Sequence, residues 1–260
     1  MTAVDGRCRL FAPEIGAALA AGQAQARGAS LRSGVAEADL VAVEKRARSK
    51  ATASSCKSAD VTLVADRVRE AYAGYAKISR MTYPGEIADW RADRGDGRTA
   101  RWRLAQSATF GWDKMIFGLA GRQGGDALLA VADFRGKKAP YTARLVIRDV
   151  TRTSGPFLDT SAGSRKRATL ARRLPPGPGV RVFAAEARSP AGEDLLPSGA
   201  KGGWAFRFPA AAIRAMAALD PREAVAIEFV FPGDNDEVRR AYVEVGDFAA
   251  GRAFLQVATR

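Results

Sequence analysis

Val225-Ala226-Ile227-Glu228-Phe229-Val230-Phe231 is the stretch of sequence that decides the fold. Its large apolar side chains occupy every second position, which is the period of a β-strand with one buried face. A polar turn over 232–237 follows, and Ala241, Val243 and Val245 then alternate in the same way. Two alternating runs joined by a short polar turn predict an antiparallel hairpin.

The same period of two begins near residue 100 and predicts further strands. We expect them at 101–106, 114–119, 128–134, 141–148, 180–188 and 204–208. Runs 128–134 and 141–148 are expected to form a hairpin over 128–149 that repeats the form of 225–247. Ordinary hairpin construction explains that likeness, and an internal duplication is the alternative. Residues 151–179 have no period and several Gly-Pro pairs, so they predict a long loop between two halves of the sheet region.

The first 80 residues have the period of helices instead. Three helices are expected: one opened by Pro13, one over 36–48 and one capped by Ser58 or Asp60. Leu40 and Val43 in the second, and a stripe from Val61 to Tyr75 in the third, are expected to face inward. The sequence therefore predicts an α+β protein. Its helical N-terminal region (1–80) precedes a mainly antiparallel β-sandwich or barrel (81–260) with one short helix near 210–219.

Cys8 and Cys56 are the only cysteines. Two free thiols are one interpretation, and a single disulfide is the other. A disulfide closing this loop of roughly 49 residues stabilises a fold by about 4 kcal/mol on the loop-entropy model. Short alanine-rich helices bury little, so we favour the disulfide and an oxidising compartment. The spacing matches neither a redox motif nor a zinc site.

The chain contains no histidine, which limits its chemistry. Ser-His-Asp and Cys-His nucleophile systems and histidine-ligated metal sites are excluded. Asp133 has the least ordinary setting of the carboxylates, but a strand-end turn residue explains it better than an acid catalyst. Asp234, Asn235, Asp236 and Glu237 match a hairpin tip better than a calcium loop. We therefore expect no catalytic residue, no metal and no cofactor.

The net charge of +13 is mostly due to arginine, which GC-rich genomes encode often. The charge is therefore weak evidence for nucleic acid. The densest basic run lies in the loop 151–179 and comprises Arg165, Lys166, Arg167, Arg172 and Arg173. All five are expected to be exposed, either as a solvated linker or as a contact site for an anionic surface or partner. No aromatic residue lies in the run, so stacking on single-stranded nucleic acid is not expected.

The chain has four tryptophans. Trp90, Trp102, Trp112 and Trp204 are expected to anchor the core or a sheet face rather than to bind a ligand.

The end of the chain resembles a known family. Glu228-Phe229-Val230-Phe231 and the run from Tyr242 to Leu255, with Gly246-Asp247-Phe248-Ala249-Ala250, are similar to the closing hairpin of the invasion-associated locus B family. The resemblance extends from Trp204 onward and implies an exported bacterial β-sandwich protein. This sequence departs from the family because it lacks paired cysteines inside the β region and adds a helical region. The whole chain also resembles exported proteins of GC-rich bacteria that carry no assigned activity.

These observations predict a periplasmic or secreted protein whose signal peptide has been removed, with a cytoplasmic location as the alternative. No apolar run is long enough to span a membrane. The function expected is non-catalytic binding or interaction with the cell envelope, through a protein or an anionic surface or polymer. One alternative is a carboxylate-driven hydrolase of cell-wall or polysaccharide material. Another is a charge-driven binder of anions, lipids or nucleic acid.

Overall fold

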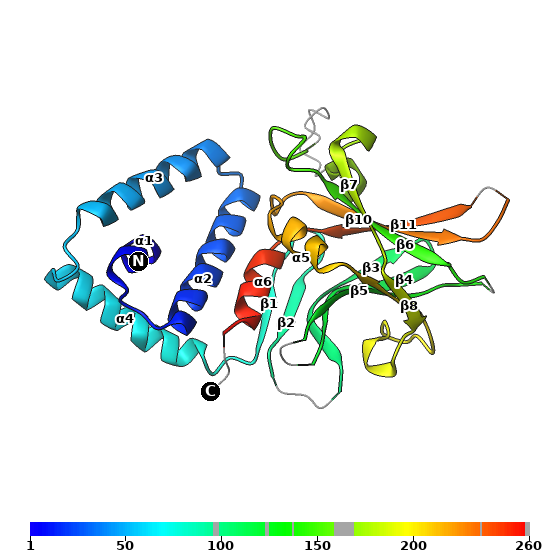
Figure 1. Cartoon of the computed structure of the whole chain (residues 1–260), viewed down its shortest axis with the longest axis horizontal. Helices are drawn as coiled ribbons and strands as arrows, with labels where there is room; N and C mark the ends of the chain where they lie inside the picture. Colours follow the sequence, from blue (N-terminus) through cyan, green and yellow to red (C-terminus); the bar gives the residue numbers. More distant parts are fainter. Residues whose placement is uncertain (96–98, 123–124, 137, 159–168, 235, 258–260) are drawn as a thin grey trace.

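The computed structural model describes every residue except 96–98, 123–124, 137, 159–168, 235 and 258–260. It confirms the α+β class, with an N-terminal helical part followed by strands in two antiparallel sheets (Figure 1). The helices are α1 (Thr2–Cys8), α2 (Pro13–Arg32), α3 (Glu37–Ala53), α4 (Ala59–Tyr75), α5 (Ala210–Ala217) and α6 (Phe248–Leu255). The strands are β1 (Arg80–Tyr83), β2 (Trp90–Asp93), β3 (Arg101–Phe110), β4 (Asp113–Gly121), β5 (Ala127–Asp133), β6 (Thr142–Arg148), β7 (Val180–Ala184), β8 (Ala187–Pro190), β9 (Trp204–Phe208), β10 (Ala224–Phe231) and β11 (Glu237–Glu244).

Two of the predicted helix starts are confirmed. Pro13 opens α2, where its missing N–H has no partner to lose. Ser58 caps α4, and its Oγ accepts the N–H of Val61 at 3.4 Å. Helix α1 was not foreseen from the sequence. It lies inside the frame that α2, α3 and α4 make (Figure 1).

The expected inward stripes of the helical part are only partly right. One buried apolar cluster in it consists of Val4, Ala51 and Val61, and another joins Tyr72 and Ala76 to Val257. Val43 is 51% exposed and Val64 is 37% exposed, so the prediction that they face a core is wrong. The physical reason is that α3 has little beside it to pack against, since its main neighbour is the short helix α1.

The strands form a seven-stranded sheet in the order β1-β2-β3-β4-β5-β9-β8 and a four-stranded sheet in the order β11-β10-β6-β7. The two sheets pack face to face around one apolar core, in which Phe110 of the larger sheet stacks on Phe229 of the smaller at 5.6 Å. The predicted hairpin of β10 and β11 is confirmed, with Phe231 opposite Glu237 next to the turn. Strand β10 is buried at every position, because the core covers one face and other chain segments cover the other.

The predicted hairpin over 128–149 is wrong. Strand β5 pairs with β4 and β9 in the larger sheet, whereas β6 pairs with β10 and β7 in the smaller one. The chain therefore crosses from one sheet to the other between these strands. An alternating pattern identifies a strand but does not identify its partner.

The C-terminal end of the described chain joins the helices to the sheets. Helix α6 lies between α2 and strands β2 and β3 (Figure 1). Phe248 and Phe254 are fully buried on it, as expected for residues that close the core, although the sequence did not predict a helix there. Within the described part of the chain, no helix combines the length and the apolar character needed to cross a membrane.

The loop predicted over 151–179 contains two short 3-10 helices, η1 (Leu170–Arg173) and η2 (Gly177–Gly179). A third, η3 (Glu193–Leu195), lies in the connection between β8 and β9. The predicted short helix near 210–219 is confirmed as α5.

Candidate functional site

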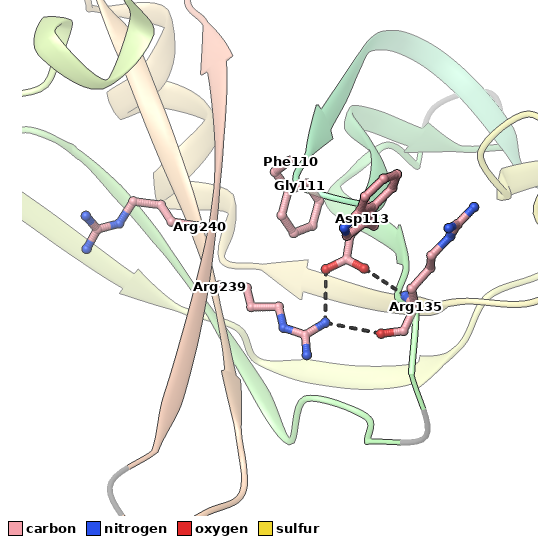
Figure 2. Close-up of a pocket in the computed structure, with 7 residues that line it drawn as sticks. Phe110, Gly111, Asp113, Arg135, Arg239 and Arg240 are labelled. Atoms are coloured by element: carbon pink, nitrogen blue, oxygen red, sulfur yellow. Dashed lines mark hydrogen bonds and ion pairs between the residues drawn. The ribbon is translucent and has the colours of Figure 1, made fainter.

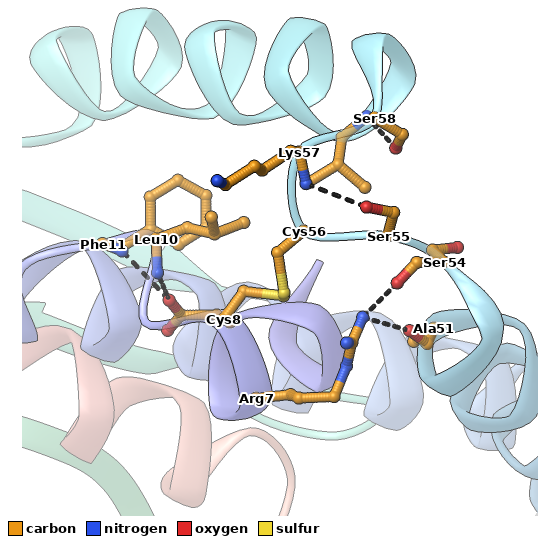
Figure 3. Close-up of a disulfide and its surroundings, with 12 residues drawn as sticks. Arg7, Cys8, Leu10, Phe11, Ala51, Ser54, Ser55, Cys56, Lys57 and Ser58 are labelled. Carbon is orange, nitrogen blue, oxygen red and sulfur yellow. Dashed lines mark hydrogen bonds between the residues drawn. A yellow bond between two sulfur atoms is a disulfide. The ribbon is translucent and has the colours of Figure 1, made fainter.

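The structure contains the disulfide between Cys8 and Cys56 (Figure 3). It joins the last residue of α1 to the connection between α3 and α4. Beside it, the Arg7 side chain donates to the carbonyl oxygen of Ala51 at 3.2 Å and to that of Ser54. The disulfide interpretation of the two cysteines is therefore confirmed, and it crosslinks the part of the molecule with the smallest core.

A pocket of about 420 Å³ lies at one end of the sandwich (Figure 2). We call it the tip pocket, and it is lined by Phe110, Gly111, Trp112, Asp113, Arg135, Arg239 and Arg240. Three elements meet here: the β3–β4 turn, the end of β5 and the strand β11. Lys114 of β4 pairs with Asp133, which places the end of β5 beside the β3–β4 turn. The β10–β11 turn lies at the same end of the sandwich. Both sheets thus contribute to one pocket.

The turn between β3 and β4 determines how Trp112 is presented. Phe110 and Asp113 pair across it, leaving Gly111 and Trp112 as the two turn residues. Gly111 has a φ of 60°, in the left-handed region that favours glycine and suits a two-residue hairpin turn. The second turn residue points away from the strands, and Trp112 is 80% exposed. The expectation that this tryptophan anchors the core or a sheet face is therefore wrong.

Asp113 positions two of the residues that line the tip pocket, Arg135 and Arg239. It is almost fully buried, and one carboxylate oxygen accepts the backbone N–H of Arg135 at 2.7 Å. The other oxygen accepts Nη1 of Arg239 at 3.1 Å (Figure 2). Both oxygens are thus engaged in positioning neighbouring groups, and a carboxylate used in this way is poorly placed to act as an acid or base catalyst.

The three arginines of the tip pocket differ in what they contact. The Arg240 guanidinium pairs with Glu228 and points away from the pocket (Figure 2). The Arg239 guanidinium also binds Glu237 and lies 4.4 Å from the centroid of the Phe231 ring. The Arg135 guanidinium lies 5.4 Å from the centroid of Trp112 and makes no ion pair with any residue that the structure describes. Arg135 is the cation that remains available to a ligand.

The predicted basic run does not form one exposed surface. Arg173 is only 5% exposed and pairs with Glu86 at 2.8 Å, so the expectation that it lies in solvent is wrong. Glu86, in the connection between β1 and β2, supplies a counter-charge to this buried guanidinium. Arg172 is exposed on η1. Arg165, Lys166 and Arg167 lie outside the described residues.

None of the described pockets is lined by a carboxylate named from the sequence. Asp133 lies half-buried at the end of β5 and lines none of the described pockets. Asp236 accepts the Tyr141 hydroxyl at 2.6 Å, and Glu237 binds Arg239. The described residues include no group of three His, Cys, Asp or Glu side chains placed to hold a metal ion.

Sequence reasoning missed Trp112, Arg135 and Arg239 as a group. One signal was present, because Gly111-Trp112-Asp113 separates two alternating runs and a tryptophan in a two-residue turn must point outward. No signal placed Arg239 there, because it reaches the pocket from the other sheet, more than a hundred residues away.

Comparisons with known proteins found no match, neither to a family model, nor to a curated protein, nor to a solved structure. The likeness of the closing hairpin to the invasion-associated locus B family therefore stays a prediction.

Proposed function

We propose that this protein is a non-catalytic binding protein that works outside the cytoplasm, and that the tip pocket contacts its partner. The observation that carries the proposal is the pairing of an 80% exposed tryptophan, Trp112, with an arginine that has no ion pair among the described residues. Tryptophan, tyrosine and arginine supply most of the binding energy at protein interfaces. Tyr141, which is 49% exposed, lies at the same end of the sandwich and extends this surface.

The disulfide supports the location. Disulfides persist in secreted and periplasmic proteins and are rare where thiols are kept reduced. Removal of a signal peptide and membership of an exported bacterial family are part of the same proposal.

The hydrolase alternative has less support. It needs a carboxyl group with a raised pKa facing a second carboxylate in one cleft. Burial raises the pKa of Asp126, but Asp126 lines none of the described pockets. The charge-driven alternative rests on the five cationic side chains of the basic run. One of them, Arg173, is paired with Glu86.

Binding to isolated bacterial cell-wall sacculi and to phosphatidylglycerol vesicles, measured by co-sedimentation, tests the proposal. Trp112→Ala and Arg135→Ala should each weaken binding about tenfold or more, as expected at an interface hot spot. Arg181→Ala is the matched control. It removes the same charge from another arginine that lies over a ring, 5.0 Å from Phe183, toward the opposite end of β6 and β7.

The alternatives give different results in the same samples. Binding that persists from low to high salt supports the proposal, whereas a steep loss with salt identifies the charge-driven alternative. Release of soluble reducing ends from the sacculi would identify a hydrolase. Equal losses in Arg135→Ala and Arg181→Ala, or no binding to either probe, would contradict a role for the tip pocket.

A further inference from the structure

The outer face of the seven-stranded sheet is covered over only part of its width. The segment between β8 and β9 folds back across it, and the Trp102 Nε1 donates to the carbonyl oxygen of Leu195 at 3.0 Å. Lys114 Nζ donates to the carbonyl oxygen of Ser198 at 3.1 Å in the same segment. Toward β1 and β2 this cover ends, and the outward-facing side chains Arg80, Thr82 and Arg91 are exposed.

A groove of about 490 Å³ lies over this uncovered part. We call it the face groove. Its apolar lining includes Trp102, Ala105 and Ile116, and its polar lining includes Arg80, Thr82, Asp89, Arg91, Asp93 and Ser107. The volume falls within the range of small-ligand sites. The lining combines one half-exposed aromatic ring with several hydrogen-bonding groups.

The charges of the face groove balance. The lining contains two arginines and two aspartates, and Arg80 pairs with Asp93 at 2.9 Å. Burial acts to raise the pKa of Asp93. The N–H of Gly95 and the Arg80 guanidinium outweigh burial and hold this pKa below its usual value. Asp93 is therefore ionised at neutral pH. Such a lining attracts neither anions nor cations by net charge, but it offers fixed donors and acceptors.

Arg91 has donors to spare. Its side chain is exposed and makes no ion pair with any residue in the described part of the chain. Ser107 and Thr82 add hydroxyl groups that both donate and accept. A ligand that uses all of these groups needs many hydroxyls and no net charge.

We propose that the face groove is a second binding site, separate from the tip pocket, which takes a neutral saccharide chain. A sugar ring has hydroxyl groups around its edge and C–H groups on its faces. The edge suits the paired charges and hydroxyls of the groove, and the faces suit Trp102 and Ile116. A saccharide chain also has the extended form that fits an open groove across several strands.

Calorimetric titration with the neutral tetramer of β-1,4-linked N-acetylglucosamine tests this site. The unaltered protein should bind it, and Arg91→Ala should weaken binding about tenfold through loss of a charged hydrogen-bond donor. Ser107→Tyr should abolish binding by filling the groove. Thr109→Tyr is the matched control, since Thr109 is exposed two residues along the same face of β3 and does not line the groove.

Trp112→Ala should bind the tetramer within about twofold of the unaltered protein, because the tip pocket is a separate site. Loss of phosphatidylglycerol vesicle binding in Trp112→Ala with retained tetramer binding would therefore support both proposals independently, because the vesicles contain no saccharide chain. Three results would each overturn the saccharide site: no heat of binding at millimolar tetramer, unchanged binding in Ser107→Tyr, or tighter binding of an anionic oligogalacturonate than of the neutral tetramer.

Discussion

The Arg94 side chain connects three segments of the chain by hydrogen bonds. It is 1% exposed and has no carboxylate partner among the described residues. Its guanidinium donates to the carbonyl oxygens of Ile78 at 2.7 Å, Tyr75 at 2.5 Å and Val257 at 3.4 Å. It also lies 4.2 Å from the centroid of the Phe254 ring. Arg94 therefore ties the end of α4, the start of β1 and the end of α6 together.

We expect Arg94→Met to lower the free energy of unfolding by about 3 kcal/mol. The substitution keeps an apolar side chain of similar length but leaves three carbonyl groups without their charged donor, and such a hydrogen bond contributes about 1.5–3 kcal/mol. Removal of a buried charge that has no carboxylate partner offsets part of this loss. Urea unfolding measures the change. Arg214→Met on the exposed face of α5 is the control, with an expected change of about 0.5 kcal/mol or less. A similar small loss for Arg94→Met would show that this side chain holds nothing together.

The sequence could not single out Arg94. Arg91 and Arg94 lie three residues apart in the same short stretch, yet one lies in solvent and the other in the core. Periodicity assigns polar residues to the outside by default, so a buried arginine becomes visible only when the carbonyls around it are assembled. Arg173 was misjudged for the same kind of reason, because its partner Glu86 comes from a distant part of the chain.

At the scale of elements, the helical part depends on its disulfide. The apolar cluster beside the disulfide contains the buried residues Val4, Ala51 and Val61, and Cys8 packs against them. A second small cluster joins Tyr72 and Ala76 to Val257. Replacing Cys8 and Cys56 by serine should lower the stability of this part by about 4 kcal/mol. All four tryptophans lie in the sheet region, so tryptophan fluorescence follows the sheets while circular dichroism at 222 nm follows mainly the helices.

In the oxidised protein the two signals should change together during urea unfolding. In Cys8→Ser/Cys56→Ser, the helical signal should be lost at a clearly lower urea concentration than the fluorescence signal. A reducing agent should lower the urea concentration at which the unaltered protein loses its helical signal. It should not change the unfolding transitions of the variant. Coincident transitions in the variant would show that the helical part does not rely on the crosslink.

The elements predicted best are those whose pattern is local. The β10–β11 hairpin, α4 with its Ser58 cap and α5 follow from alternation, capping and helical spacing within a few residues. Helix α6 was missed because Phe248, Phe254 and Leu255 are too few to display a period. The partners of β5 and β6 were wrong because pairing is decided by the whole sheet, not by the strand.

At the scale of the whole molecule, the helical part is docked on the sandwich through α2 and α6 (Figure 1). Arg32 of α2 forms two hydrogen bonds to Asp247, at 2.8 and 2.7 Å. The Asp247 side chain is 2% exposed, so this pair is shielded from water and depends on its geometry. Gly28 lies one helical turn before Arg32, and a Cβ built on it would lie 2.3 Å from Asp247 Oδ1. The close approach of α2 therefore requires glycine at this position.

Alanine in place of glycine tests the docking, because α2 contains a matched pair of positions. At Gly22 an added Cβ meets nothing within 4 Å, so Gly22→Ala should stabilise the protein by about 0.5–1 kcal/mol, as glycine is a poor helix former. Gly28→Ala has the same intrinsic gain but must displace a carboxylate held by Arg32, so we expect a net loss of about 2 kcal/mol. In an Asp247→Ala background that loss should disappear, since the obstructing oxygens are gone. Thermal unfolding of the four variants measures these differences, and a stabilising Gly28→Ala would show that α2 does not pack this closely on the sandwich.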